Sequence, residues 1–125
     1  MKPGYTGLRR IAHATRYSIA GLKFAYRVES AFRQEVWMAV VLIPAGLLFG
    51  SDAAERILLA GAMLIVLITE LLNTAVEAVV DRVGDDYHTL SECAKDAASA
   101  AVFLSLALLA LAWAVVLVER FWLGG

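Results

Sequence analysis

The sequence is poor in the residues that make disulfides, metal clusters and breaks between domains. Of its 125 residues, one is cysteine (Cys93), two are histidine and two are proline. A single thiol excludes an internal disulfide, and one cysteine with two histidines is too few for a zinc site of the usual kind. No linker-like composition or internal repeat divides the chain, so we expect one domain over residues 1–125.

Charge is nearly absent from three long stretches. Val36–Gly50 and Ala97–Val118 contain no charged residue, and Ile57–Val80 contains only Glu70 and Glu77. With 61% hydrophobic residues and a mean hydropathy of +0.72, the chain is more apolar than a soluble domain of its length. A helix needs about 20 residues to cross a bilayer core, so the sequence predicts membrane spans at about 32–50, 57–81 and 97–120. In the first span, Pro44 predicts either an earlier helix start or a kink.

Acidic residues are scarce at the amino end. Residues 1–33 hold seven lysines and arginines and one acid, Glu29. By the positive-inside rule, the N-terminus and the link 82–96 should lie in the cytoplasm and the C-terminus outside. Apolar residues recur at helical spacing from Leu8 to Tyr26, which predicts an amphipathic helix on the inner membrane surface over about 6–30, with Gly21 as the place for a break. The basic start leads into no early apolar segment, so no signal peptide is expected.

The second predicted span carries a polar face in the stretch "TELLNTAVEAVVDR". At about 100° per residue, Glu70, Asn73, Thr74, Glu77 and Asp81 lie within about 100° of one another. A charge at the centre of a bilayer costs several kcal/mol, so this face should meet protein or water. If the helix enters from outside near Ile57, Glu70 lies about 20 Å deep and Glu77 about 30 Å deep. The acids therefore form a cluster that begins beneath the inner headgroups and opens to the cytosol.

This polar face has three interpretations. Helix packing would explain Asn73 and Thr74 but explains three acids poorly. An ion or proton path would need polar groups in the outer half of the span, where Ile57–Ile68 is apolar. The remaining interpretation is chemistry at the inner interface. Shielding such a face from lipid would also favour self-association, because three helices alone cannot enclose it and admit a substrate.

The residue types suit phosphoryl transfer to a lipid. Glu29 and Glu77 offer oxygen ligands for a hard cation. Arg10 and Lys95 offer charge-assisted donors for phosphates, and Glu70 is placed to act as a general base. A cation, phosphate clamps and a base are the parts of such a reaction. The loops G-x-x-x-x-G-K-[ST] and G-x-G-x-x-G are absent, so any nucleotide site is built differently from either common class.

Three stretches carry a family resemblance: "ELLNTAVEAVVDR", "DDYH" and "AKDAASAAV". In this order they resemble the bacterial integral-membrane diacylglycerol kinases, and the match is collinear over nearly the whole chain. The resemblance implies an all-α membrane protein with three transmembrane helices and an N-terminal surface helix, assembled as a homotrimer. It also implies Mg²⁺- and ATP-dependent phosphorylation of diacylglycerol to phosphatidate in the bacterial inner membrane, with no nucleic-acid partner.

The resemblance also carries roles for single residues. Glu70 matches the catalytic acid, Glu29 and Glu77 match the metal ligands, and Asn73 and Asp81 match other essential polar positions. The implied nucleotide contacts are Arg10, Tyr17, Glu29, Glu77, Asp86, Tyr87, His88, Lys95 and Asp96. The implied lipid contacts are Arg10, Glu35, Arg56, Glu70, Ser99 and Trp113.

Some positions bear on the choice of substrate. A sister branch of the family phosphorylates undecaprenol, and the extended N-terminal helix, Arg56 and the Trp113 region favour diacylglycerol. Pro44 and the pair Glu92–Cys93 depart from the family pattern and leave the central motif intact.

Overall fold

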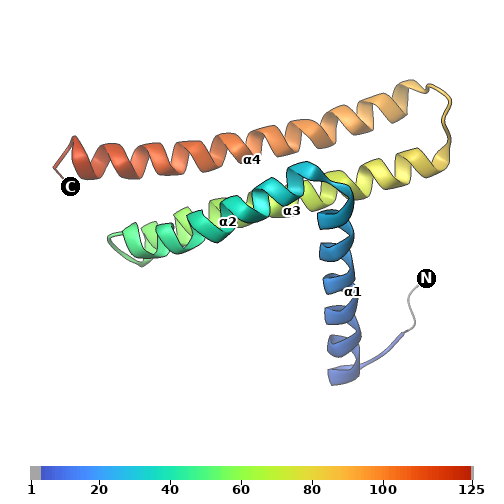
Figure 1. Ribbon diagram of the computed structural model, residues 1–125, viewed down its shortest axis with the longest axis horizontal. Coiled ribbons are helices and arrows are strands. Elements are labelled where there is room, and N and C mark those ends of the chain that lie inside the picture. Colours follow the sequence, from blue (N-terminus) through green and yellow to red (C-terminus); the bar gives the residue numbers. More distant parts are fainter. Residues whose placement is uncertain (1–3, 125) are drawn as a thin grey trace.

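The computed structural model describes residues 4–124, and all regular secondary structure in that range is α-helical (Figure 1). Its elements are α1 (Gly7–Val28), α2 (Ser30–Phe49), α3 (Ala53–Val83) and α4 (Thr89–Phe121). Helices α2, α3 and α4 are long and apolar enough to cross a membrane. The predicted fold class, an all-α membrane protein with three long apolar helices and a separate N-terminal helix, is confirmed.

The helices run further than the apolar stretches that predicted them. Helix α3 begins at Ala53, where the Asp52 side chain accepts a hydrogen bond from the Glu55 N–H at 2.9 Å. Helix α4 begins at Thr89, well before the apolar run, because backbone hydrogen bonds continue a helix through polar sequence as readily as through apolar sequence. Helix α2 begins at Ser30 and continues through Pro44, so of the two outcomes predicted from Pro44 it has the earlier start. Helix α1 passes through Gly21 without the predicted break.

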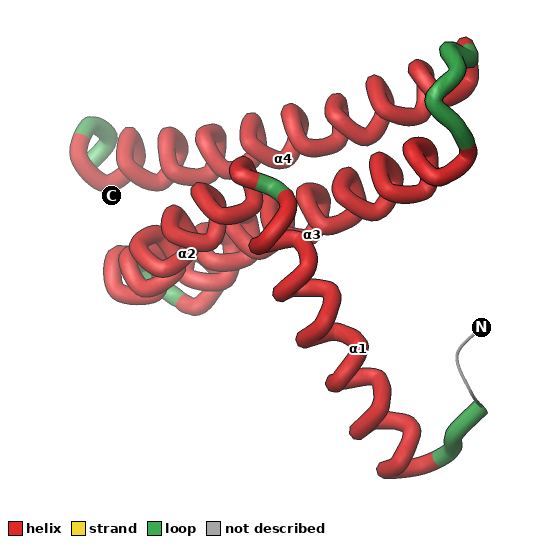
Figure 2. Tube along the Cα trace, turned by 45° about the vertical axis from the view of Figure 1, so that its right-hand side comes forward, coloured by secondary structure: helices red, strands yellow, loops and turns green. Residues whose placement is uncertain are grey.

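The three long helices lie side by side, with α3 in the middle (Figures 1 and 2). The largest buried side chains of α3 are Leu59, Met63 and Val66. They pack against Ala39 of α2 and against α4 residues Leu109, Ala112 and Val116. At Gly46, an added Cβ would lie 2.8 Å from the Cβ of Leu59, so α2 and α3 approach closely only because this position lacks a side chain.

Polar and aromatic contacts close the end of the bundle away from the α3–α4 link. The Arg120 guanidinium lies 3.6 Å from the Glu55 carboxylate and 4.5 Å from the centre of the Phe49 ring. Arg56 Nε donates to the Gly50 carbonyl at 3.2 Å. One arginine of α4 therefore contacts both α2 and α3 at this end.

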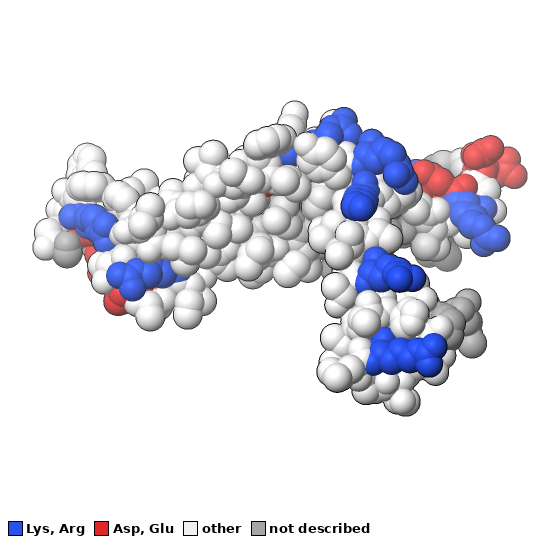
Figure 3. All heavy atoms as spheres, turned by 60° about the horizontal axis from the view of Figure 1, so that its bottom comes forward, with Lys and Arg blue, Asp and Glu red and all other residues white. Residues whose placement is uncertain are grey.

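Helix α1 leaves the bundle and runs across the direction of the other three helices (Figures 1 and 2). Its apolar side chains, among them Leu8, Ile11 and Leu22, are exposed. Figure 3 shows lysines and arginines on α1 and at its junction with the bundle, and an almost uncharged surface along the bundle. One base of the N-terminal excess, Lys2, lies outside the described residues. The arrangement suits a bundle in lipid with α1 at its surface.

Candidate functional site

Two pairs of acids cross from the start of α2 to α3. The carboxyl of Glu77 interacts with that of Glu29, the single residue between α1 and α2. Deeper in the bundle, the carboxyl of Glu35 interacts with that of Glu70. The Glu70 and Glu77 carboxyls also interact with each other. Four acids thus follow one line, and the two pairs are separated by about 10 Å of helix rise.

The inner pair is buried. Glu35 is 5% exposed and Glu70 is 3% exposed. Neither carboxylate oxygen of Glu35 has a hydrogen-bond partner within the described part of the chain. Ionised carboxylates only accept hydrogen bonds, so two facing carboxyls satisfy one another only when one of them keeps its proton and donates it. A buried oxygen without a donor is costly. Glu35 therefore has acceptor positions that a hydroxyl or amine of a bound molecule can fill.

Neighbouring polar side chains orient one of these carboxyls and tie α3 to α4. Asn73 Nδ2 donates to Glu77 Oε1 at 3.1 Å. The Thr74 hydroxyl, which is buried, donates to the Glu70 carbonyl at 3.0 Å. One residue before Glu70, the Thr69 hydroxyl donates to Ser105 Oγ of α4 at 2.9 Å. The predicted polar face of α3 is therefore held by contacts within α3 and with α4.

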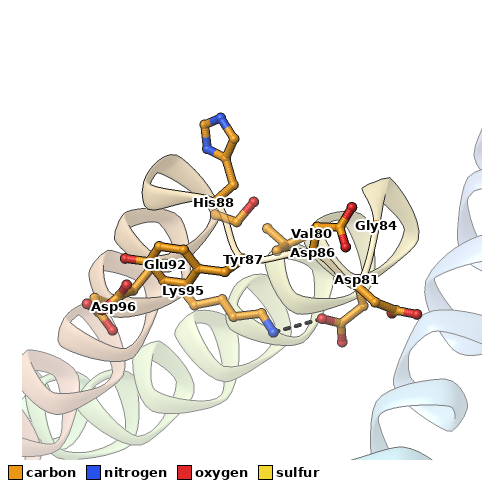
Figure 4. Close-up of a pocket in the computed structure, with 11 residues that line it drawn as sticks. Val80, Asp81, Gly84, Asp86, Tyr87, His88, Glu92, Lys95 and Asp96 are labelled. Carbon is orange, nitrogen blue, oxygen red and sulfur yellow. Dashed lines mark hydrogen bonds and ion pairs between the residues drawn. The ribbon is translucent and has the colours of Figure 1, made fainter.

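A cavity of about 510 Å³ lies beside the outer pair, between the end of α3 and the start of α4 (Figure 4). Lys95 Nζ donates to Asp81 Oδ1 at 2.7 Å within it, and the Lys95 charge also acts on Glu77. The cavity is lined mainly by polar and charged residues, including Asp81, Asp85, Asp86, Tyr87, His88, Glu92, Lys95 and Asp96. Five sequence-predicted nucleotide residues (Asp86, Tyr87, His88, Lys95 and Asp96) thus meet at one cavity.

His88 has a structural contact in this loop. Its Nδ1 accepts a hydrogen bond from the Leu90 N–H at 3.1 Å, which caps the start of α4. In Figure 4 its ring points away from the Lys95–Asp81 pair.

Arg10 and Tyr17 lie in a separate groove on α1. This groove, of about 430 Å³, is lined by Gly4, Tyr5, Arg10, His13, Ala14, Tyr17 and Ser18. The rings of Tyr5 and His13 stack there at 3.9 Å. Arg10 lies 19 residues before Glu29, which is about 28 Å along a helix. Figures 1 and 2 show the N-terminal end of α1 far from the α3–α4 link. Within one chain, the α1 groove and the cavity are therefore two separate sites.

The predicted lipid contacts are also divided between the two ends of the bundle. Ser99 is exposed one helical turn after Lys95. Arg56 and Trp113 lie at the opposite end, where the Trp113 ring packs 6.1 Å from that of Phe49. Arg56 precedes Glu70 by 14 residues, or about 21 Å of helix. One lipid headgroup therefore cannot touch both Glu70 and Arg56 of the same chain.

The acids at the mouth of the site suit a cation that shares its ligands with a nucleotide. No group of three or more His, Cys, Asp or Glu side chains gathers around one point among residues 4–124. Mg²⁺ bound with a nucleotide uses one or two carboxylates and completes its shell with phosphate oxygens and water. Glu29 and Glu77 supply that number of carboxylates, and Asn73 orients one of them.

Sequence reasoning paired Glu29 with Glu77 as cation ligands but missed the second pair, Glu35 with Glu70. Glu29 and Glu35 are six residues apart, and Glu70 and Glu77 are seven apart. Consecutive helices joined by a short turn run antiparallel, so equal steps of about two turns bring the acids opposite each other in two pairs. This similar spacing was the feature of the sequence from which the two pairs could have been predicted. The Thr69–Ser105 bond was also missed, because no pattern in the sequence sets the rotation of α4 against α3.

Fold and site together define a multi-pass membrane protein with a buried acid pair inside its bundle and a polar cavity between the end of α3 and the start of α4. Residues 16–117 match the family model described as "Prokaryotic diacylglycerol kinase". The chain belongs to this family. It is similar to the diacylglycerol kinase of Pseudomonas aeruginosa, with 50% identity over 91% of this chain and 93% of the relative.

Two further relatives cover as much of the chain. The diacylglycerol kinase of Haemophilus influenzae is 45% identical over 90% of this chain and 95% of its own. That of Escherichia coli is 41% identical over 93% of this chain and 95% of its own. The family expected from the central motif is confirmed.

Proposed function

We propose that this protein is a diacylglycerol kinase, which transfers the γ-phosphoryl group of ATP to the free hydroxyl of diacylglycerol and forms phosphatidate and ADP. Family membership supports the reaction class. The observation that carries the proposal is the buried Glu35–Glu70 pair, in which neither Glu35 carboxylate oxygen has a hydrogen-bond partner within the described residues. A lipid alcohol brings the missing O–H to this place.

Glu70 is the proposed general base. The diacylglycerol hydroxyl donates to its carboxylate, and Glu70 takes the proton as the alcohol oxygen forms a bond to the γ-phosphorus. The bond between the γ-phosphorus and the bridging oxygen breaks, and ADP leaves with the electron pair. Glu35, buried opposite Glu70, is proposed to keep the Glu70 carboxylate in position beside the hydroxyl. Both acids lie away from bulk water, which disfavours transfer of the phosphoryl group to water.

Glu29 and Glu77 are proposed to hold Mg²⁺ together with the phosphates of ATP. When bound, this ion supplies positive charge that offsets the negative charge of the transferred group. Lys95 is proposed to bind a phosphate, and the Asn73 amide keeps Glu77 oriented. The acidic lining of the cavity, including Asp86 and Asp96, suits the amino group of adenine, which only donates.

Arg10 and Tyr17 are proposed to complete the nucleotide site from a neighbouring subunit. The groove that contains them lies about 28 Å of helix from Glu29 in the same chain. In the homotrimer that we propose, α1 of one subunit extends toward the cavity of the next. Arg56 and Trp113 stay predictions for contact with lipid at the opposite end of the bundle.

We place the reaction at the cytoplasmic face of the bacterial inner membrane, where ATP is present. The excess of base before α2 supports an inside N-terminus and an outside C-terminus. Helix α1, with exposed apolar and basic faces, is proposed to lie on the inner surface.

The direct test is a kinase assay of the purified protein with ATP and Mg²⁺ in mixed micelles. Diacylglycerol and undecaprenol are offered separately in the same detergent. We expect phosphatidate to form at a rate well above that of undecaprenyl phosphate. Preference for undecaprenol would move the protein to the sister branch, and absence of both products would overturn the kinase proposal.

A further inference from the structure

The junction between α1 and α2 is a single residue. Helix α1 ends at Val28, α2 begins at Ser30, and Glu29 between them has extended backbone angles (φ −115°, ψ 112°). Two soft dihedral angles thus set the direction of α1 against the bundle. The residue with these angles is also the proposed cation ligand opposite Glu77. Any change of direction at this elbow moves that ligand.

Arg33 spans the elbow from α2. Its Nη1 donates to the Tyr26 carbonyl at 2.8 Å and to the Arg27 carbonyl at 3.1 Å, both in the last turn of α1. The last carbonyls of a helix have no partner within the helix, and they carry its negative dipole end. A guanidinium there satisfies two of them and brings a favourable charge. One side chain therefore joins the end of α1 to the start of α2 across Glu29.

The direction of the Arg33 side chain also leaves Glu29 available. Arg33 follows Glu29 by four residues, the spacing at which a glutamate and an arginine often pair on a helix. Within the described chain, the ion pairs are Lys95–Asp81 and Arg120–Glu55, and Arg33 is in neither. Its guanidinium donates instead to the backbone carbonyls of Tyr26 and Arg27. The Glu29 carboxylate is thus directed to Glu77 rather than neutralised by its nearest base.

Burial anchors the elbow on both sides of this bridge. Ala25, one turn before the end of α1, is 1% exposed, and Phe32, beside Arg33, is 2% exposed. Helix α1 contacts α2 and α3, and Ala25 is its only described residue that is buried. The elbow has a small apolar anchor, so the Arg33 bridge is a large part of what resists a swing of α1.

We infer that Arg33 is a positioning residue that braces the α1–α2 elbow and thereby holds Glu29 opposite Glu77 for the cation. The inference rests on the proposed cation site. In this role Arg33 does not contact substrate or nucleotide. It acts by fixing the position of Glu29, a ligand of the cation. Outer-shell residues of this kind typically change metal affinity by about 10–100-fold.

The test measures Mn²⁺ binding by electron paramagnetic resonance in the full-length protein with ADP, so that no turnover is involved. We expect Arg33→Gln to weaken Mn²⁺ binding by at least about tenfold. Arg33→Lys keeps the charge but shortens the reach and lacks the planar fork, so its affinity should be intermediate. Arg27→Gln removes a base from the same elbow whose side chain makes no described contact, and it should bind Mn²⁺ like wild type.

A second measurement follows the elbow itself. A spin label on Lys23→Cys, in a Cys93→Ala background, reports the motion of α1, and Arg33→Gln should make it more mobile. Either wild-type Mn²⁺ affinity or wild-type label mobility in Arg33→Gln would overturn the inference. If Arg33→Gln does not fold, as judged by circular dichroism, the decision passes to Arg33→Lys. Wild-type affinity in that folded variant would overturn the inference too.

A failure of the cation site can be told apart from a failure of the brace. If Glu77→Gln binds Mn²⁺ as tightly as wild type, the ion does not use the outer acid pair and the proposed site is wrong. The mobility of the spin label alone then decides whether Arg33 braces the elbow. If Glu77→Gln loses Mn²⁺ while Arg33→Gln does not, the site stands and the brace is wrong.

Discussion

Lys95 and Asp81 form an ion pair at 2.7 Å across the mouth of the cavity, and both side chains are substantially exposed, at 43% and 66%. An exposed pair of this kind contributes about 0–1 kcal/mol to stability. The Lys95 ammonium can therefore exchange Asp81 for a phosphate at little cost. The ion pair with Asp81 keeps Lys95 at the cavity where we propose that the nucleotide binds.

Replacing Lys95 should affect nucleotide binding more than stability. Lys95→Met removes a charge-assisted hydrogen bond worth about 1.5–3 kcal/mol, so the KM for ATP should rise roughly tenfold to a hundredfold. Helicity and assembly should stay unchanged. The KM is measured by titrating ATP at saturating diacylglycerol. The control is Lys23→Met, which removes the same charge from α1. An unchanged KM would remove Lys95 from the nucleotide site.

Glu70→Gln should separate binding from chemistry. The amide keeps the size of the side chain but cannot accept the proton, so turnover should fall by about 10²–10⁴-fold while ATP still binds. Glu70→Asp should recover little, because its carboxylate is withdrawn by one methylene. Turnover and nucleotide affinity are measured on the same preparations. Near-normal turnover in Glu70→Gln would leave Glu70 an orienting role, with positioning and charge supplying the catalysis.

Glu77→Gln should shift the dependence on Mg²⁺. Loss of one of two carboxylate ligands should weaken the ion and lower activity strongly, with partial recovery at high Mg²⁺ or with another divalent metal. The matched control is Glu119→Gln, which removes an exposed acid from the last turns of α4. A full Mg²⁺ titration of both variants is required. Wild-type behaviour of Glu77→Gln would exclude this residue from the cation site.

Activity should not depend on a gradient. Detergent micelles have no second compartment, so a lipid kinase turns over in them and a transport protein has nothing to transport. We expect phosphatidate formation in micelles and in closed vesicles alike. Ion flux in vesicles without lipid phosphorylation in either system would favour the transport interpretation of the acids.

The orientation of the chain can be tested by reporter fusion. The excess of base before α2 predicts a cytoplasmic N-terminus, and three crossings then put the C-terminus in the periplasm. A reporter at the C-terminus that is active only outside the cytoplasm should give a signal, and the same reporter in the link 82–96 should not. A cytoplasmic C-terminus would contradict the three-span topology and the depth assigned to Glu70.

The sequence was enough to predict the helices because their main determinants are local. Long uncharged stretches predict α2, α3 and α4, and apolar spacing predicts α1. The sequence left two outcomes open at Pro44, and the structure has the earlier helix start, at Ser30. The break predicted near Gly21 is absent. Such outcomes depend on whether neighbouring turns and the surrounding packing compensate for a missing hydrogen bond or a flexible residue.

The site was predicted as a set of residues rather than as a geometry. The motif around Glu70 and Glu77 identified the acidic face, and the structure places Glu29 opposite Glu77 as the cation interpretation requires. The direct Glu35–Glu70 pairing needed the relative position of two helices. The separation of Arg10 from Lys95 needed the direction of α1. Both depend on contacts between distant parts of the chain, which helical periodicity does not specify.

The lengths of α3 and α4 have a consequence for substrate choice. At 31 and 33 residues, they extend about 46 and 50 Å, whereas the hydrocarbon core measures about 30 Å. With the apolar parts in lipid, backbone hydrogen bonds hold the carboxylate of Glu70 at a fixed depth below the headgroups. In the proposed mechanism, with Glu70 as the base, the depth of this carboxylate selects the substrate: an alcohol is phosphorylated when its hydroxyl lies at that level. Tails that leave the hydroxyl at the same level should be interchangeable.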